Sequence, residues 1–313
     1  MRHVAFALAL LPTAALADPI TFAWLPNAQT PQVDMALAGD YFTEAGLDVQ
    51  LVPFASGREA FEALLGGQVD IAFMAEFPAA TGALTGQDFA IVADLSRYTG
   101  SRIIGNAPMA SAADLAGKRI GTTLGTNVDY FLSTVLTTAG VEAEVINAAP
   151  GDLVPALVRG DVDAIVPFPT FYAGAADALG ERYSELRPGG YAPHYVLSVT
   201  SAMTGERADD LTAFLGALVK ADADVAADPV AAAAMVSTSL GGNVTAEALQ
   251  AMWADMDFGT ILAPDLLDLL VDEGKWIAAQ GVVRADAPTA DTIAPYLVGA
   301  PLAAAAPGNV TLD

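Results

Sequence analysis

The chain has 313 residues, enough for two lobes of ordinary size, and its apolar fraction of 54% excludes an intrinsically disordered protein. A formal net charge of −24 argues against nucleic acid as a partner, because nucleic-acid binding requires a basic surface. The sequence contains no cysteine, which excludes disulfides, a lipid-anchored cysteine and thiol catalysis.

The amino-terminal segment has the pattern of an export signal. Two basic residues precede an apolar stretch, and Ala-Leu-Ala at 15–17 has the small-x-small form that signal peptidase cleaves. A membrane-anchoring helix is the alternative, but polar Asp18 and helix-breaking Pro19 follow the apolar stretch directly. We therefore expect a cleaved signal peptide at 1–17 and a mature protein in a Gram-negative periplasm.

Strand and helix patterns alternate after the signal. Such alternation predicts a parallel sheet that is covered by helices and connected by right-handed crossovers. The predicted elements of this part are strands at 21–25, 47–54, 69–74 and 89–95 and helices at 33–45 and 57–68.

The alternation then begins again, and the repeat is partly literal. GQVDIA at 67–72 matches GDVDAI at 160–165, and each follows a predicted helix and leads into a predicted strand. Two lobes of the same βα design explain this most simply, with chance recurrence of a common helix–strand junction as the alternative. The predicted elements are a strand and turn at 117–125, a helix at 127–140, and strand, helix and strand at 141–149, 151–160 and 161–168.

The last third of the sequence is mostly helical and rich in alanine. The segments SRYTG (96–100) and YVLSVTS (195–201) flank the second repeat, which suits two segments that cross between lobes. The sequence thus predicts an α/β fold of two doubly wound lobes, with lobe 1 at 18–98 and 202–313 and lobe 2 at 99–201. A ligand cleft is expected between the lobes, at the carboxyl ends of the strands.

The turn RIGTTLGTN at 119–127 looks like a phosphate loop, but it lacks the lysine that a Walker motif places after its last glycine. Lys118 comes too early to replace it, so nucleotide hydrolysis is not expected. Thr126 is predicted to cap the helix that follows, with Asp129 as its acidic capping partner.

The same turn is a candidate ligand site, because amide groups at a helix start favour negative or electron-rich atoms. The alternative is an ordinary capped helix with nothing bound. The candidate contacts in the turn are Thr122, Thr123, Gly125, Thr126 and Asn127.

Several segments resemble the periplasmic receptors of ATP-binding-cassette importers for nitrate, sulfonates, taurine and thiamine-pyrimidine precursors. The resemblance covers about residues 21–169 and is carried by DLAGKRIGTTLGT, GGQVDIAF, GDVDAIVPF and GDYFTEAGLDVQLV. It implies a type II periplasmic-binding fold, in which two α/β lobes joined by two crossover strands close over one small molecule. It also implies an inner-membrane permease as partner, and it does not specify the ligand.

WLPN at 24–27 resembles the first ligand loop of the pyrimidine-precursor receptors, in which an aromatic residue stacks on a ring. Trp24 is expected at the end of a strand, and Pro26 should stiffen the turn that presents Asn27 and Gln29. A tryptophan buried in the core is the alternative.

The chain departs from many sulfonate and taurine receptors after its second repeat. Where those receptors have Trp-Glu-Pro, this sequence has Pro-Phe-Pro at 167–169, which weakens the case for an aminosulfonate. Glu76 could supply a carboxylate from the first lobe, and a solvated loop carboxylate is the alternative.

Arg58 could contact an anionic group, although an exposed arginine at a helix start is the alternative. Arg97 and Arg102 lie near the first crossover, where either could form a salt bridge between the lobes. The remaining candidate ligand contacts are Ser56, Met74, Phe168 and His194.

The composition gives little support for catalysis. His194 would be the one histidine left after signal removal, and the sequence has neither an HExxH motif nor a Cys/His cluster. We expect no catalytic residue, metal or cofactor, and a monomeric receptor that closes over a flat heterocycle or a small organic anion such as a sulfonate. The alternatives are an enzyme of the same fold acting on a pyrimidine-like substrate and a sensory ligand-binding protein.

Overall fold

The computed structural model describes residues 18–281 and 283–312. The export signal predicted at 1–17 lies outside these residues. Within them, no helix combines the length and apolar character that a membrane span requires.

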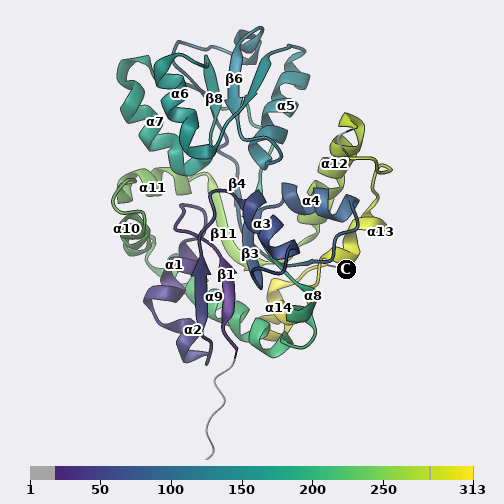
Figure 1. The fold of residues 1–313 in the computed structure, drawn as a ribbon. Coiled ribbons are helices and arrows are strands. Elements are labelled where there is room, and N and C mark those ends of the chain that lie inside the picture. Colours follow the sequence, from purple (N-terminus) through teal and green to yellow (C-terminus); the bar gives the residue numbers. More distant parts are fainter. Residues whose placement is uncertain (1–17, 282, 313) are drawn as a thin grey trace, which may run out of the picture.

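The described residues form two lobes, each built around its own β-sheet (Figure 1). The first lobe contains a six-stranded sheet in the order β11-β4-β10-β3-β1-β2. In this sheet β3, β1 and β2 are parallel, whereas β10 runs antiparallel to both of its neighbours. Its strands are β1 (Ile20–Ala23), β2 (Val49–Val52), β3 (Ile71–Ala75), β4 (Ala90–Tyr98), β10 (His194–Val199) and β11 (Met256–Ile261).

The second lobe contains a five-stranded sheet in the order β7-β6-β8-β5-β9. Strands β7, β6 and β8 are parallel, and β5 is antiparallel to β8 and β9. Its strands are β5 (Ile103–Gly105), β6 (Arg119–Thr122), β7 (Glu144–Asn147), β8 (Ala164–Val166) and β9 (Ser184–Leu186).

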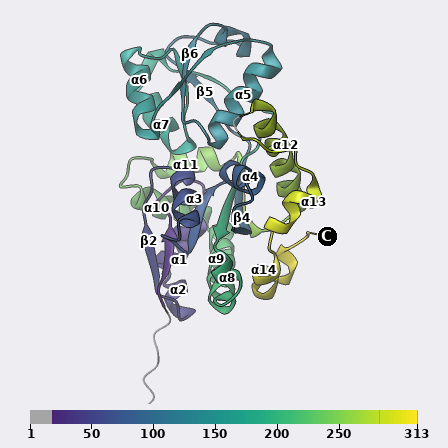
Figure 2. The same cartoon turned by 45° about the vertical axis from the view of Figure 1, so that its right-hand side comes forward.

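Helices cover both sheets, and the carboxyl-terminal helices wrap the first lobe (Figures 1 and 2). The second lobe has α5 (Asn127–Ala139), α6 (Leu153–Arg159) and α7 (Tyr172–Leu179). The first lobe has α1 (Pro31–Ala38), α2 (Tyr41–Glu44), α3 (Gly57–Leu65), α4 (Phe77–Leu84), α8 (Ser201–Thr204), α9 (Ala208–Ala227), α10 (Pro229–Ser239), α11 (Ala246–Trp253), α12 (Pro264–Gln280), α13 (Ala290–Ile293) and α14 (Ala300–Ala305).

The predicted helix at 127–140 is confirmed as α5, and its apolar stripe is buried. Gly140 ends it with a left-handed φ of 65°, a conformation that glycine adopts without steric cost. The predicted helix at 33–45 is instead divided into α1 and α2, because Asp40 has a left-handed φ of 57° that interrupts the helix between them.

The literal repeat has the same structural role in both lobes. Asp70 precedes β3 and accepts a hydrogen bond from the backbone N–H of Thr21, at the neighbouring strand β1, over 2.8 Å. Asp163 precedes β8 and accepts one from the backbone N–H of Arg119, at the neighbouring strand β6, over 2.9 Å. Each aspartate thus ties its strand to the parallel neighbour, which supports a shared βα design over chance recurrence.

The two crossings between the lobes lie at the ends of β4 and β10. We placed residues 195–201 at the end of the second lobe, but β10 pairs with both β3 and β4 in the middle of the first sheet. All six of its residues are buried, because the strand has a partner on each side and its apolar side chains pack into hydrophobic clusters. The chain therefore re-enters the first lobe at His194, earlier than predicted.

Candidate ligand-binding site

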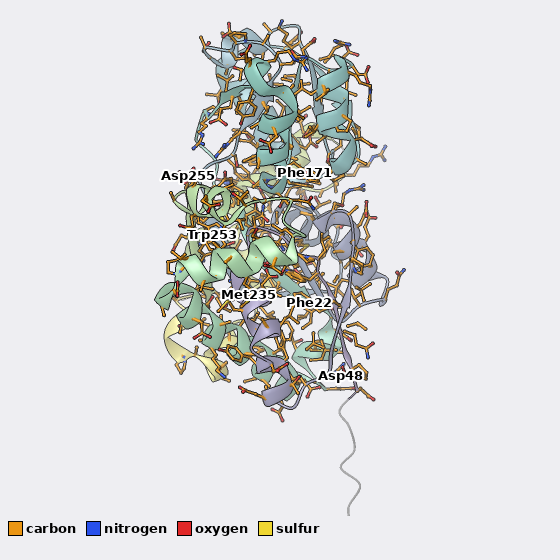
Figure 3. All side chains as sticks on the ribbon, turned by 90° about the vertical axis from the view of Figure 1, so that its left-hand side faces the viewer. Phe22, Asp48, Phe171, Met235, Trp253 and Asp255 are labelled. Carbon is orange, nitrogen blue, oxygen red and sulfur yellow. The ribbon has the colours of Figure 1, made fainter. Side chains whose placement is uncertain are left out.

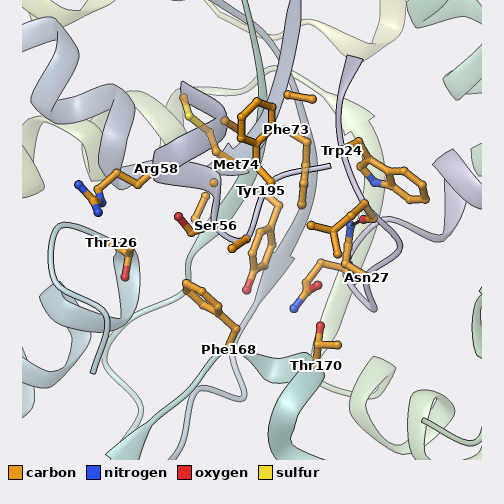
Figure 4. A pocket seen from close by; sticks show the side chains of 18 of the residues that line it. Trp24, Asn27, Ser56, Arg58, Phe73, Met74, Thr126, Phe168, Thr170 and Tyr195 are labelled. Carbon is orange, nitrogen blue, oxygen red and sulfur yellow. Dashed lines mark hydrogen bonds between the residues drawn. The ribbon is translucent and has the colours of Figure 1, made fainter. Parts of the chain in front are cut away.

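A cavity of about 170 Å³ lies between the two lobes (Figure 4). The first lobe contributes the carboxyl ends of β1 and β3 and the start of α3, and the second contributes the start of α5 and the loop after β8. Carboxyl ends of parallel strands meet at one edge of a sheet, so both lobes present their connecting loops to the same space. The cavity therefore lies at the predicted position, between the lobes and at the carboxyl ends of the strands.

The walls of the cavity are largely aromatic and apolar. Apart from Tyr195 on β10, the polar side chains among the lining residues come from turns and helix starts, where hydroxyl and amide groups also serve the local backbone. The cavity is lined by Ala23, Trp24, Leu25, Pro26, Asn27, Gln29, Phe54, Ala55, Ser56, Gly57, Arg58, Ala60, Phe73, Met74, Ala75, Pro78, Thr126, Asn127, Phe168, Thr170, Phe171 and Tyr195.

The turn after β1 is held rigid by its own side chains. The Oδ1 atom of Asn27 accepts hydrogen bonds from the backbone N–H of Gln29 over 2.8 Å and from the Thr30 hydroxyl over 3.1 Å. The indole N–H of Trp24 donates to the same hydroxyl oxygen over 3.0 Å. These contacts position the turn before any ligand arrives.

Trp24 combines both roles that the sequence allowed. It lines the cavity, but only 3% of it is exposed, and its ring packs beside Phe22 at a centroid distance of 6.4 Å. In Figure 4 the indole turns away from the middle of the cavity, whereas Tyr195 of the first lobe and Phe168 of the second lobe point into it. Phe168 and Tyr195 are thus better placed than Trp24 to cover the faces of a flat ligand.

The start of α3 meets the second lobe at the edge of the cavity. Ser56 caps α3 by accepting a hydrogen bond from the backbone N–H of Glu59. Arg58 forms an exposed ion pair with Glu62 at 3.0 Å. A Cβ atom on Gly125 would lie 3.2 Å from Cδ of Arg58, and Gly125 has a φ of 72°, so both space and backbone favour glycine there.

The threonine turn differs in detail from its prediction. Thr126 stands at the N-cap of α5 but does not cap it, because its hydroxyl donates to the carbonyl oxygen of Thr123 over 2.7 Å. Asp129 accepts instead from the backbone N–H of Gly125 over 3.0 Å. Of the predicted turn contacts, Thr126 and Asn127 reach the cavity, whereas Thr122, Thr123 and Gly125 do not line it.

Two further candidates, Glu76 and His194, do not line the cavity. Glu76 is fully buried and accepts hydrogen bonds from the Tyr191 hydroxyl and, over 3.0 Å, from the backbone N–H of His194. His194 Nδ1 lies 2.7 Å from a carboxylate oxygen of Asp94. Burial alone would lower the pKa of His194, but the hydrogen bond to Asp94 and nearby carboxylates raise it above its usual value. Both residues hold the crossover in place.

The predicted arginines do not join the lobes. Arg97 pairs with Asp94 and Asp257 within the first sheet, and Arg102 pairs with Glu185 within the second. An ion pair at 3.0 Å between Arg187, after β9, and Asp255, before β11, spans the boundary instead. Figure 3 shows Asp255 at the level where the two lobes meet.

Sequence reasoning missed several lining residues. Phe73 in β3 and Tyr195 in β10 are next to residues that were chosen, and the pattern of alternating burial did not tell which neighbour faces the cleft. The segment after β8 was represented only by Phe168, although Thr170 and Phe171 follow in the same loop. Figure 3 shows Phe171 at the boundary between the lobes.

Comparison with solved structures confirms the fold. The alkanesulfonate-binding protein SsuA of Xanthomonas axonopodis pv. citri, bound to MOPS, superposes with a TM-score of 0.75 at 17% identity, over 91% of this chain and 100% of that one. The aliphatic sulphonate binding protein SsuA of Escherichia coli gives 0.73 at 15% identity, over 90% and 92%. The desulfurization enzyme DszB gives 0.65 at 17% identity, over 92% and 98%. At these identities the likeness shows the fold and not the ligand.

Sequence comparison identifies relatives and the family. A Brucella abortus protein, whose name describes it provisionally as a binding protein, is 30% identical over 168 residues, or 51% of this chain and 52% of that protein. The chain thus spans about half the length of the curated relatives it matches. The model of the family described as NMT1/THI5 like matches residues 27–232. The chain therefore belongs to the NMT1/THI5-like family, as the resemblance in its sequence predicted.

Proposed function

We propose that this protein is the periplasmic receptor of an ATP-binding-cassette importer, which closes its two lobes around a small organic solute and delivers it to an inner-membrane permease. The export signal predicted at 1–17 would bring it to the periplasm. The proposal treats the receptor as a monomer, because one chain already supplies both walls of the cavity.

The position of the cavity supports this function most directly. Its lining comes from both lobes, so a bound solute contacts both and favours the closed arrangement over an open one. The free energy of those contacts sets how far the ligand shifts the open–closed equilibrium.

Some of the residues that line the cavity are the proposed ligand contacts. Phe168 and Tyr195 would cover the faces of a planar group, and hydroxyl and amide groups at the cavity edge would bind its polar atoms. The proposed contacts already foreseen from the sequence are Trp24, Asn27, Gln29, Ser56, Met74, Thr126, Asn127 and Phe168.

An enzyme is the second candidate, because DszB has the same fold. Among the described residues that line the cavity, no cysteine, histidine, lysine, aspartate or glutamate is present. General acid–base or covalent catalysis mostly uses such a group, and the serine, threonine and tyrosine hydroxyls that do line the cavity need a neighbouring base to become strong nucleophiles. The cavity thus offers contacts for binding and lacks a base or strong nucleophile, which supports a receptor.

A binding experiment with recovery of the ligand tests the proposal. The purified protein would be screened by thermal shift against pyrimidines, sulfonates, nitrate and aromatic acids and amides, and each hit measured by calorimetry and native mass spectrometry. We expect one equivalent of ligand per chain, recovered unchanged after prolonged incubation. Conversion of the ligand would contradict the receptor function, and cytoplasmic protein with an intact amino terminus would contradict its place in the periplasm.

A further inference from the structure

The lining of the cavity is poor in charge. Of the described residues that line it, Arg58 is the one with a full charge at neutral pH, and it lies at the edge. An ammonium group in this cavity would have no carboxylate partner among those residues. Moving an unpaired charge out of water is costly, so a cationic ligand is disfavoured.

The positive charge of Arg58 already has a negative partner. Its guanidinium lies 3.0 Å from Glu62, and the two side chains are 44% and 60% exposed. Water screens such a pair, and Glu62 cancels most of the field that would attract an anion into the cavity.

The positive end of the dipole of helix α5 also has a negative partner. Asp129 lies in the first turn of α5 and accepts the hydrogen bond of the Gly125 N–H over 3.0 Å. A carboxylate in the first turn is the group that a helix dipole stabilises. The helix start next to Thr126 and Asn127 is therefore largely compensated before any ligand binds.

The hydroxyl of Tyr195 is a buried polar group in the wall of the cavity. Tyr195 is 5% exposed and lines the cavity, and its hydroxyl makes no hydrogen bond of good geometry, although the side chain of Gln29 lies close enough to lower its pKa. Burial raises the pKa of Tyr195 well above its ordinary value, so the hydroxyl stays protonated and can donate. The side chain of Gln29 lies beside it, and Figure 4 shows the hydroxyl directed toward the space between Phe168 and Asn27.

We propose that the ligand is an uncharged, planar molecule that presents a hydrogen-bond acceptor to the Tyr195 hydroxyl, and that sulfonates, carboxylates and amines of the same shape bind more weakly. This inference rests on the proposed receptor function and selects the neutral heterocycle over the small organic anion. The ring would lie against Phe168, and its acceptor would bind the buried hydroxyl of Tyr195.

Matched probes that differ in charge test the inference. Benzamide, benzoate and benzylammonium have similar shapes, and the corresponding naphthalene compounds form a larger set. We expect the amide of at least one set to bind about ten-fold or more tightly than both charged members, since burial of the charge has no compensation.

The outcomes separate this inference from the receptor function. Equal or tighter binding of a carboxylate or ammonium compound, recovered unchanged, would overturn the neutral-ligand inference and leave the receptor function standing. Absence of binding by all six compounds at millimolar concentration would contradict the neutral-ligand inference, whereas the receptor function is contradicted only if the wider panel of solutes also gives no ligand.

Three variants locate the cause of the selectivity. Tyr195→Phe should weaken binding of the amide by about five- to ten-fold, the effect of one lost buried hydrogen bond. Glu62→Gln should raise the affinity for the carboxylate and leave that for the amide unchanged, because it frees Arg58. Glu44→Gln removes a similarly exposed ion pair away from the cavity, in which Lys220 is 53% and Glu44 is 61% exposed, and should change neither. A carboxylate affinity unmoved by Glu62→Gln would refute the compensation by Glu62.

Discussion

Phe168 and Trp24 both line the cavity, yet their surroundings differ. The ring of Phe168 points into the cavity from the second lobe, whereas Trp24 is packed into the core and bound to Thr30 through its indole N–H. A change at Phe168 should therefore act on binding, and a change at Trp24 should act first on stability.

Substitution of each ring by leucine tests this difference. Phe168→Leu should lower the affinity for the tightest-binding ring-containing probe by about five-fold, because one aromatic stacking contact contributes about 1 kcal/mol. The melting temperature should change little. Trp24→Leu should lower the free energy of unfolding by about 2 kcal/mol, because it leaves part of a core site unfilled. Calorimetry and urea titration measure the two effects, and the reverse assignment would show that Trp24 is the stacking residue.

Gly125 shows how one backbone position links the lobes. Gly125→Ala should cost about 1 kcal/mol of stability for its left-handed φ and should also weaken ligand binding, because the new Cβ would crowd Arg58. Gly140→Ala is the matched control, since Gly140 has a φ of 65° and no atom within 4 Å of an added Cβ. It should lose similar stability and keep full affinity; equal affinities in both variants would contradict a role of Gly125 in lobe contact.

At the scale of the elements, the carboxyl group of Glu273 on α12 joins Glu76 and Tyr191 in a buried cluster. Tyr191 lies between β9 and β10 and packs on Phe131 of the second lobe, so the cluster connects both lobes behind the cavity. Burial raises the pKa of both carboxyl groups. The neighbouring Glu76 raises the pKa of Glu273 further, well above its usual value, whereas hydrogen bonds to Glu76 oppose the effect of burial and favour its ionised form. Glu273 is therefore the protonated member of the pair.

The two glutamates should respond oppositely to the same substitution. A raised pKa means that the stability from Glu273 is full below its usual pKa of 4.5 and falls as pH rises through the raised value. Glu273→Gln should thus increase stability at pH 8 and flatten its decline with pH. Glu76→Gln should cost about 1–3 kcal/mol, because its amide would face a buried donor. Urea titrations at pH 5 and 8 measure both, and a destabilised Glu273→Gln at pH 8 would show that Glu273 is ionised in the fold.

Over the whole molecule, buried carboxyls make stability depend on pH. Burial raises the pKa of Asp34 and of Asp222 from 3.8 to about 6. Each contributes stability that is complete below pH 3.8 and is lost as pH rises through about 6. The net charge of −24 acts in the same direction, because repulsion grows as carboxyl groups ionise.

The melting temperature should therefore fall between pH 5 and pH 8, and salt should restore only the part due to surface repulsion. The double variant Asp34→Asn with Asp222→Asn should show a smaller fall in high salt than the unchanged protein. Differential scanning calorimetry at pH 5 and pH 8 would measure this fall for both proteins. The salt concentration would be about 0.5–1 M, at which the screening length is on the order of 4 Å. An identical fall in both proteins would contradict the raised pKa values.

The sequence by itself determined the α/β class, the two repeated lobes, the family and most of the turns that form the cavity. Those features depend on local spacing: alternating strands and helices, and an aspartate before β3 and β8 that bonds the neighbouring strand. Two kinds of chemistry could also be excluded from the sequence. A phosphate loop needs a lysine directly after its last glycine, which the turn at 119–127 lacks, and thiol catalysis needs a cysteine, which the whole sequence lacks.

Only the tertiary structure decided which side chains at those turns face the ligand. Thr126 and Asn127 reach the cavity while Thr122 does not, and Tyr195 reaches it from a strand whose assignment to a lobe the sequence misplaced. The bonds that settle these positions join residues far apart in the chain, such as Tyr191 with Glu76 and Arg187 with Asp255. Such contacts depend on how the sheets and helices pack together, and a local sequence pattern does not predict that packing.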